Sequence, residues 1–118
     1  MLAGRRPTIF GDGEQSRDFV YVADVVQANL KAAMAPDAPG KAFNVASGVC
    51  TTVNRLYGLI AEQLDVSEPP VYGEPRAGDI LHSGADITAA KTVLGYDPAF
   101  SLEAGLAPTV DWLRAQEL

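Results

Sequence analysis

The sequence has little of the chemistry on which most catalytic and metal sites depend. Cysteine and histidine each occur once in 118 residues. A single cysteine excludes an internal disulfide, and Cys50 with His82 is too small a set for a zinc site of the usual cysteine and histidine type. The sequence contains no Tyr-x-x-x-Lys, and no two carboxylates stand out as an acid and base pair. We therefore assign no catalytic residue and no metal ligand to this chain.

Long apolar runs and a dinucleotide-binding fingerprint are also missing. No apolar run approaches the roughly 18 residues of a membrane span, and MLAGRRPTIF does not have the apolar region of a signal peptide. We expect a cytoplasmic protein with no membrane partner. The net charge of −6 opposes nonspecific nucleic-acid binding, which rests on phosphate neutralisation. The Gly-Asp-Gly of residues 11–13 leads into a polar run and a second strand, so the context of a Gly-x-Gly-x-x-Gly turn fails.

The rest of the sequence is typical of one soluble domain covering residues 1–118, and the order of its predicted strands and helices indicates an α/β fold. Apolar residues make up 47 % and charged residues 20 %, which is ordinary for a globular protein. β-branched and aromatic runs predict strands at 8–10, 18–22 and 42–48, and prolines favour an extended stretch at 68–75. Four helices are expected, each behind a capping side chain. The caps are Asp24, Thr52, Asp86 and Ser101.

Two predicted elements carry further expectations. Residues 42–48, AFNVASG, are apolar on both faces, which suits the inside of a parallel sheet. The last helix contains Pro108, which removes a backbone hydrogen bond and should kink the axis. Cys50 is expected to be a buried, inert thiol, since free cysteine behaves as a small hydrophobe. His82 is expected to be a surface or structural histidine.

Arginine is the residue type left with binding chemistry. Its planar, permanently charged fork suits phosphate oxygens. Arg17 closes the first turn, and Arg76 precedes Gly-Asp in the proline-rich loop. Spacing leaves two interpretations open for each: phosphate binding, or an ion pair with a neighbouring acid, Asp18 for Arg17 and Asp79 for Arg76.

Five segments occur in one order and spacing: PTIFGDGEQSRDFVYVADVVQA, AFNVASG, EPRAGDI, SGADITAAKTVLGYDP and SLEAGL. Together they resemble the C-terminal part of the extended short-chain dehydrogenase/reductases, the NAD-dependent epimerase/dehydratase family, with UDP-glucose 4-epimerases nearest. The resemblance covers essentially the whole chain. It implies a small α/β substrate-binding domain with short strands and about four helices. In the family, the Rossmann domain that holds NAD and the Tyr-x-x-x-Lys pair precede this region, so we expect a fragment that binds no cofactor alone.

The resemblance also implies roles for individual residues. The strand TIF matches the strand that lines the nucleobase pocket, and two arginines match those that contact the diphosphate. An aspartate matches the one that orients the second arginine and approaches the ribose. The segment GDILHSGAD departs from the family pattern, because it has Leu-His where many relatives have basic residues. The substrate-binding residues so implied are Thr8, Ile9, Phe10, Arg17, Arg76 and Asp79.

The expected function is the UDP-sugar-binding portion of an NAD-dependent sugar-nucleotide epimerase, inactive alone. The implied reaction of the parent oxidises sugar C4, turns the keto intermediate and reduces it from the other face. Two alternatives stay open: a fragment of a dTDP-glucose 4,6-dehydratase or UDP-glucuronate decarboxylase, and a free-standing noncatalytic protein that binds nucleotide sugars or itself. Residues 42–48 lie against the Rossmann sheet in relatives. We therefore predict a homodimer or higher assembly through that exposed strand edge.

Overall fold

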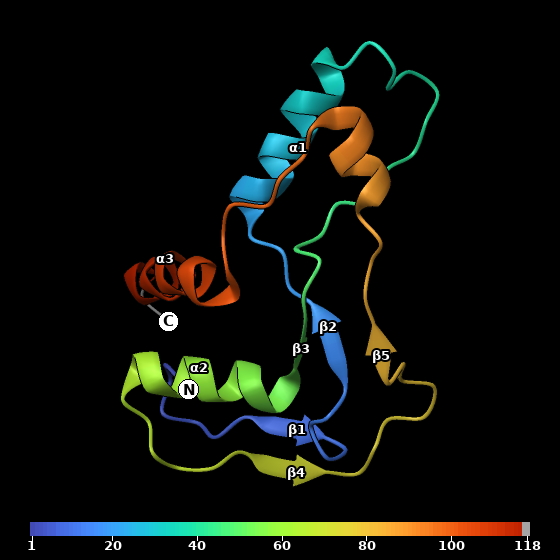
Figure 1. Cartoon of the computed structure of the whole chain (residues 1–118). Helices are drawn as coiled ribbons and strands as arrows, with labels where there is room; N and C mark the ends of the chain where they lie inside the picture. The colour runs from blue at the N-terminus through green and yellow to red at the C-terminus, as the bar shows by residue number, and fades with distance from the viewer. Residues whose placement is uncertain (117–118) are drawn as a thin grey trace.

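The computed structural model describes residues 1–116 as an elongated α/β arrangement of short strands and four helices (Figure 1). This confirms the predicted fold class. The strands are β1 (Thr8–Phe10), β2 (Ser16–Asp18), β3 (Cys50–Thr52), β4 (Val71–Gly73) and β5 (His82–Ser83). The helices are α1 (Val22–Met34), α2 (Val53–Leu64), a short π-helix η1 (Ala90–Leu94) and α3 (Leu102–Ala115). No helix in the described part of the chain is long and apolar enough to cross a membrane.

The strands form two small sheets. β1 pairs with β4 in parallel, with Ile9 opposite Tyr72. The second sheet has the order β3-β2-β5, in which β2 is antiparallel to β3 and parallel to β5. Arg17 therefore lies in the middle of the central strand of the second sheet, opposite Thr51 and Ser83. Pairing on both sides fixes the backbone from which its side chain projects.

Two expected strands differ from those observed. The strand expected at 18–22 is Ser16–Asp18 instead, because α1 already begins at Val22. The segment 42–48 forms no strand. Its end is bound by a side chain rather than by a ladder: the Asp18 carboxylate accepts the backbone N–H groups of Ser47 and Gly48, at 2.7 and 2.8 Å. An apolar sequence predicts burial, but it does not say which partner takes the backbone hydrogen bonds.

Two of the four predicted helix caps are confirmed, and Asp86 is not the N-cap of η1, where that position belongs to Ala89. Thr52 accepts a hydrogen bond from the Arg55 N–H at the start of α2, and Ser101 accepts one from Ala104 at the start of α3. Asp24 is not an N-cap, because that position belongs to Tyr21.

The buried Asp24 carboxylate instead binds a distant segment. It lies inside the first turn of α1 and accepts the backbone N–H groups of Ala99 and Phe100 at 2.9 and 3.2 Å. It thereby ties α1 to the segment that leads into α3.

A compact arm, made of α1, η1 and residues 35–47, 85–89 and 95–97, stands away from the two sheets (Figure 1). Its buried core is small and rich in alanine. Tyr96 lies in it with 1 % of its surface exposed and donates from its hydroxyl to the Ala46 carbonyl at 2.8 Å. Burial, and next the nearby Asp24 carboxylate, raise the pKa of Tyr96 above its ordinary value. The core residues are Ala28, Ala46, Ile87, Ala90, Leu94 and Tyr96.

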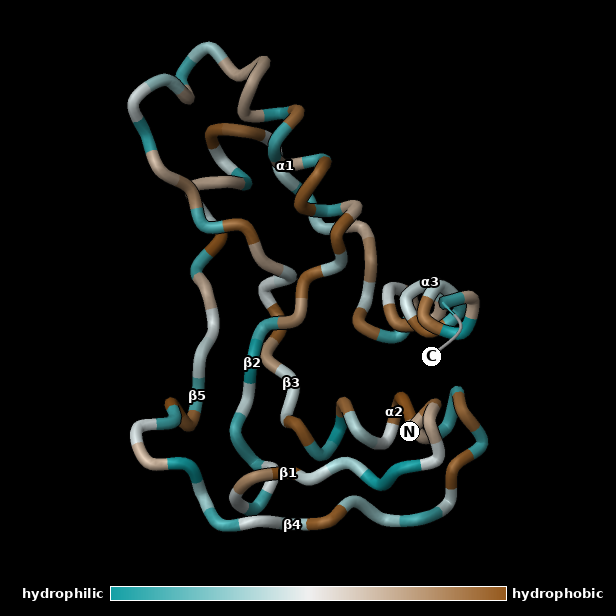
Figure 2. The backbone as a smooth tube through the Cα atoms, turned by 180° about the vertical axis from the view of Figure 1, so that it is seen from behind, coloured by the Kyte–Doolittle hydropathy of each residue, from teal (hydrophilic) through white to brown (hydrophobic). Residues whose placement is uncertain are grey.

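The overall shape is extended for a chain of this length. The radius of gyration is 16.8 Å, against about 13 to 14 Å for a compact domain of this size. Apolar residues recur along α1 (Figure 2). Val22, Val26, Leu30 and Met34 are 64, 51, 63 and 84 % exposed. They follow one another at four-residue spacing and therefore form one stripe on the helix.

Candidate functional site

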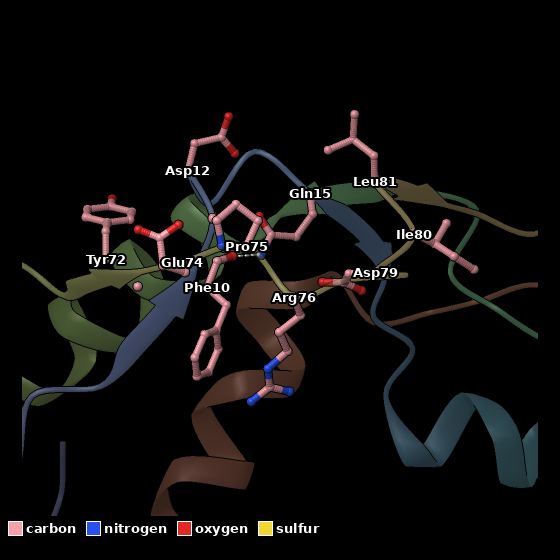
Figure 3. Close-up of a pocket in the computed structure, with 12 residues that line it drawn as sticks. Phe10, Asp12, Gln15, Tyr72, Glu74, Pro75, Arg76, Asp79, Ile80 and Leu81 are labelled. Carbon is pink, nitrogen blue, oxygen red and sulfur yellow. Dashed lines mark hydrogen bonds between the residues drawn. The ribbon is translucent and has the colours of Figure 1, made fainter.

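A cavity of about 500 Å³ opens between the turn after β1, strand β4 and the loop of residues 74–81 (Figure 3). This volume is in the usual range of small-molecule sites, roughly 300 to 1,000 Å³. Its lining combines two aromatic side chains, one arginine, three carboxylates, a glutamine and apolar side chains. These side chains are Phe10, Asp12, Gln15, Tyr72, Glu74, Pro75, Arg76, Asp79, Ile80 and Leu81.

The turn after β1 holds one wall of the cavity in place. Gly11 and Gly13 adopt φ angles of 82° and 79°, which glycine reaches without steric cost. Between them, Asp12 accepts the N–H of Glu14 at 2.9 Å. Gln15 then reaches back and donates its amide to the Phe10 carbonyl at 2.8 Å. The tight turn therefore fixes the backbone that presents the Phe10 ring.

Arg76 lies over this ring. Its Cζ atom is 4.0 Å from the centroid of Phe10, which is the geometry of a cation–π contact. Figure 3 shows both side chains pointing the same way from their strand and loop. The sequence-based prediction that Asp79 orients Arg76 is wrong, because the carboxylate pairs with the other arginine.

Arg17 and Asp79 form an ion pair of 2.9 Å between Nη2 and Oδ1. Their side chains are 29 and 41 % exposed, so the pair is partly screened by water. Arg17 also donates from Nη1 to the carbonyl of Ser16 at 2.8 Å. It does not line the cavity itself, but it is joined to the lining through Asp79. The guanidinium fork keeps further donors with which it can meet an anion.

The two ion pairs considered from spacing are therefore not the ones that form. Asp18, the neighbour of Arg17, binds the 47–48 segment, and Asp79 takes Arg17 instead of Arg76. The partners are 62 positions apart in the sequence. Only the folded chain brings them together.

The predicted nucleobase strand contributes one side chain to the cavity. Alternation along β1 turns Ile9 into the core, where it is 5 % exposed, and leaves Thr8 and Phe10 on the outer face. Phe10 lines the cavity, whereas Thr8 and Ile9 lie outside its lining. Of the six predicted residues, Phe10, Arg76 and Asp79 line one cavity and Arg17 contacts it through Asp79.

Sequence reasoning missed several lining residues, of which Asp12, Gln15, Tyr72 and Glu74 are polar. Tyr72 lies on β4 and donates its hydroxyl to the Asn54 Oδ1 at 2.9 Å. It is 53 % exposed. An aromatic side chain inside a proline-rich extended stretch was the available signal, since such a stretch is at the surface and an exposed aromatic there suits a binding role. Nothing in the local sequence marked Gln15.

The thiol and the imidazole are at the surface. Cys50 was expected to be buried, and this is wrong: it lies exposed on β3, at an edge of the three-stranded sheet, with its sulfur 3.8 Å from the Ser83 carbonyl. His82 is exposed, as expected, and its Nδ1 shares a hydrogen bond of 2.9 Å with the Ser16 hydroxyl. Within residues 1–116, no three histidine, cysteine or acidic side chains are grouped to hold a metal ion.

Comparison with known proteins relates nearly the whole chain to one group of enzymes. The profile of the NAD dependent epimerase/dehydratase family matches residues 1–46. UDP-glucose 4-epimerase of Mycolicibacterium smegmatis is 42 % identical over 97 % of this chain and 36 % of its own length. A dTDP-glucose 4,6-dehydratase of Xanthomonas campestris is 31 % identical over 94 % of this chain and 34 % of its own.

Solved structures agree with these matches. The crystal structure of UDP-glucose 4-epimerase from Thermotoga maritima with UDP-glucose superposes with a TM-score of 0.91 at 48 % identity. The superposition covers 98 % of this chain and 37 % of that one. UDP-N-acetylglucosamine 4-epimerase from Methanobrevibacter ruminantium gives a TM-score of 0.90 at 39 % identity, covering 98 % and 36 %.

The family profile, the curated relatives and the solved structures agree that nearly the whole chain is similar to one portion of the extended short-chain dehydrogenase/reductases of the NAD dependent epimerase/dehydratase family. The chain spans about a third of the length of the curated relatives it matches, 36 % for the first two.

Proposed function

We propose that this chain is the sugar-nucleotide-binding portion of an NAD-dependent epimerase of the UDP-glucose 4-epimerase type. The observation that carries this proposal is the convergence of Phe10, Arg76 and the Arg17–Asp79 pair on one cavity. A nucleoside diphosphate offers a flat base, a ribose and two phosphates. The Phe10 ring, the Asp79 carboxylate and the two arginine forks offer one partner to each of those groups, and the carboxylates of Asp12 and Glu74 also line the cavity.

In this proposal, Phe10 meets the nucleobase, Arg17 and Arg76 meet the diphosphate, and Asp79 approaches the ribose. Such an anchor suits an epimerase because the nucleotide stays bound while the sugar turns between two faces. The solved structure of the relative MoeE5 is a complex with UDP-glucuronic acid and NAD, which supports a nucleotide sugar as the ligand class.

The residues present here do not fit NAD. The glycines of the 11–13 turn are followed by strand β2, whereas a dinucleotide pyrophosphate requires the N-terminus of a helix at that point. We expect no turnover from these residues alone.

Calorimetric titration of UDP-glucose, UDP and dTDP tests the proposal. We expect UDP-glucose and UDP to bind, and Arg17→Ala to weaken both about tenfold, because a charge-assisted phosphate contact is lost. Arg55→Ala is the matched control, since Arg55 pairs with Glu103 outside the cavity and is 59 % exposed. Binding that is equally strong in Arg17→Ala and the wild-type chain would reject the anchor.

The same titration separates the alternative within the family. The dTDP-glucose 4,6-dehydratase relatives, at 31 % identity, favour a thymine nucleotide as the second candidate ligand. Tighter binding of dTDP than of UDP would favour a dehydratase fragment over an epimerase fragment.

We further propose that the chain associates with a second copy of itself. Residues 42–48 form no strand, so they offer no strand edge for association. We propose that the copies associate through the outer face of α1 instead. The exposed residues of α1 include no charged side chain, since Asp24 is buried and Lys31 binds the Gly95 carbonyl. An uncharged apolar face can meet its own copy without repulsion despite the net charge of −6.

Sedimentation measures this association. We expect a dimer or larger species that becomes monomeric in the variant Leu30→Glu, which places a charge in the middle of the stripe. Val49→Glu is the control, because Val49 is equally exposed, at 64 %, but lies outside α1. A well-folded wild-type monomer at high concentration contradicts the proposal.

A further inference from the structure

The aromatic face that should receive a nucleobase is already occupied. The Arg76 guanidinium lies 4.0 Å from the Phe10 centroid, about the separation at which a base would stack on the ring. Both side chains line the same cavity. A planar cation and a planar base cannot cover the same face of one ring at once.

Arg76 is held there by little besides this contact. The ion pairs of residues 1–116 join Arg17 to Asp79, Arg55 to Glu103 and Arg114 to Asp111, and none includes Arg76.

The backbone around Arg76 is fixed while its side chain is exposed. The Arg76 carbonyl accepts the N–H of Asp79 at 3.2 Å in a tight turn, and Gly78 has a φ of 80°. The side chain itself is at the surface. The loop can therefore stay in place while the guanidinium moves.

We propose that Arg76 makes this site select nucleotides over nucleosides. In the unliganded chain it covers the face of Phe10, and a phosphate draws it away because a guanidinium–phosphate fork is stronger than an exposed cation–π contact. A nucleoside must displace Arg76 and offers it no new partner. A nucleoside diphosphate displaces the same side chain and supplies that partner. This inference rests on the proposed function.

The proposal predicts opposite effects of one substitution on two ligands. Arg76→Ala uncovers the ring, so uridine should bind about three times more tightly, the fold-change that corresponds to loss of an exposed cation–π contact. The same substitution removes a phosphate ligand, so UDP should bind about ten times more weakly. A residue that only stabilised the loop would move both affinities in the same direction.

Ligand-observed NMR titrations of uridine and UDP into four forms of the chain test this: wild type, Arg76→Ala, Arg55→Ala and the double variant Phe10→Leu/Arg76→Ala. Circular dichroism checks that each form is folded. Arg55→Ala should match the wild type for both ligands, because Arg55 lies outside the cavity. The double variant should lose the gain for uridine, because the uncovered ring is gone.

The outcomes separate the two proposals. UDP that does not bind the wild-type chain would reject the proposed function. UDP that binds and weakens in Arg76→Ala, with uridine unchanged or weaker, would overturn the inference alone. In that case the base stacks on the outer side of Arg76 and the two side chains act as one platform.

Discussion

The arm and the two-sheet end of the molecule, which comprises strands β1 to β5 and helix α2, are held together by different means. In the arm, α1 and η1 pack around alanines, so that small side chains bring backbones close and leave Ala28 and Ala90 at most 1 % exposed. At the two-sheet end, strands of two or three residues are joined by side chains that reach across loops. Arg6 donates to the Pro69 carbonyl, and Arg17 pairs with Asp79. The arm is held mainly by apolar packing, whereas the two-sheet end combines a few buried apolar residues, Ile9, Leu59 and Ala61, with exposed polar contacts between loops.

This difference predicts that the arm contributes most to the stability of the fold, whereas the two-sheet end contributes most to ligand binding. Buried contacts in the arm are expensive to remove, because nothing replaces them. Contacts at the two-sheet end are partly exposed, so water replaces much of what a substitution removes. Substitutions in the arm should therefore change the free energy of unfolding, and substitutions around the cavity should change binding.

The largest effect is expected from Asp24→Ala. The carboxylate is 1 % exposed and accepts two backbone N–H groups, those of Ala99 and Phe100. Removing it deletes two part-buried hydrogen bonds to a charged group, each worth about 2 kcal/mol, so the free energy of unfolding should fall by about 4 kcal/mol. Urea denaturation measures the loss. Asp111→Ala is the control, because that carboxylate is 73 % exposed, and equal losses in the two variants would break the comparison.

The next largest effect is expected from Gly13→Ala at the two-sheet end, compared with Gly4→Ala. It tests whether a contact at this end can resist displacement by an added methyl group. A Cβ at Gly13 would stand 2.0 Å from the Asn54 Oδ1, whereas one at Gly4 would meet nothing within 4 Å. Both glycines have positive φ angles, 79° and 68°. Gly4→Ala should therefore cost only the backbone strain, about 1 kcal/mol.

Gly13→Ala adds displacement of Asn54, which donates to the Asp12 carbonyl, for a total of about 3 kcal/mol. Thermal or urea unfolding of the pair measures the difference between them. A difference near zero would show that Asn54 moves aside at no cost in the free energy of unfolding. The turn of residues 11–13 would then tolerate substitution more easily than the arm does.

A smaller effect is expected from Tyr96→Phe in the arm. The ring stays, but the hydrogen bond to the Ala46 carbonyl is lost, which should cost about 1 kcal/mol at neutral pH. The folded chain raises the pKa of Tyr96, chiefly by burial, so it favours the neutral phenol. The stability that this shift contributes is fully present below the unfolded pKa of about 10 and is lost as pH rises through the folded pKa.

The phenylalanine variant cannot lose that contribution. The difference in the free energy of unfolding between the wild type and Tyr96→Phe should therefore narrow above pH 10. Urea titrations at neutral and alkaline pH measure it. A gap that stays constant with pH would show that Tyr96 does not titrate differently in the folded and unfolded chains.

The sequence predicts local features of this fold well and long-range pairings poorly. Caps at Thr52 and Ser101 depend on neighbours three residues away, and capping chemistry is local. Asp24 has the same side-chain chemistry as a cap, but tertiary structure assigns it to backbone groups 75 and 76 positions on. Residues 42–48 have the apolar pattern of a buried strand, yet Asp18 takes their terminal N–H groups. Nothing in the sequence of residues 42–48 indicates that Asp18 is the partner of these N–H groups.

The candidate site shows the same limit. The resemblance to a known family named Arg17, Arg76 and Asp79 together, and the structure brings them to one end of the molecule. Which arginine the carboxylate binds depends on a loop that returns 62 positions later. Tyr72 enters the cavity because β4 pairs with β1 in parallel, a register that neither strand determines alone.

The smallest effect is expected from Arg55→Ala, an ion-pair deletion at the surface. Arg55 and Glu103 are 59 and 53 % exposed, and water replaces such a contact readily. The pKa of Glu103 is held below its ordinary value first by a backbone N–H at the start of α3, with Arg55 a lesser cause. The stability from this lowered pKa is present above the unfolded value and is lost as pH falls through the folded one. Because the backbone N–H remains, Arg55→Ala should keep the same acid dependence, and urea unfolding at neutral pH should show no resolvable change. A loss comparable to that of Asp24→Ala would show that exposed contacts stabilise the two-sheet end as strongly as packing stabilises the arm.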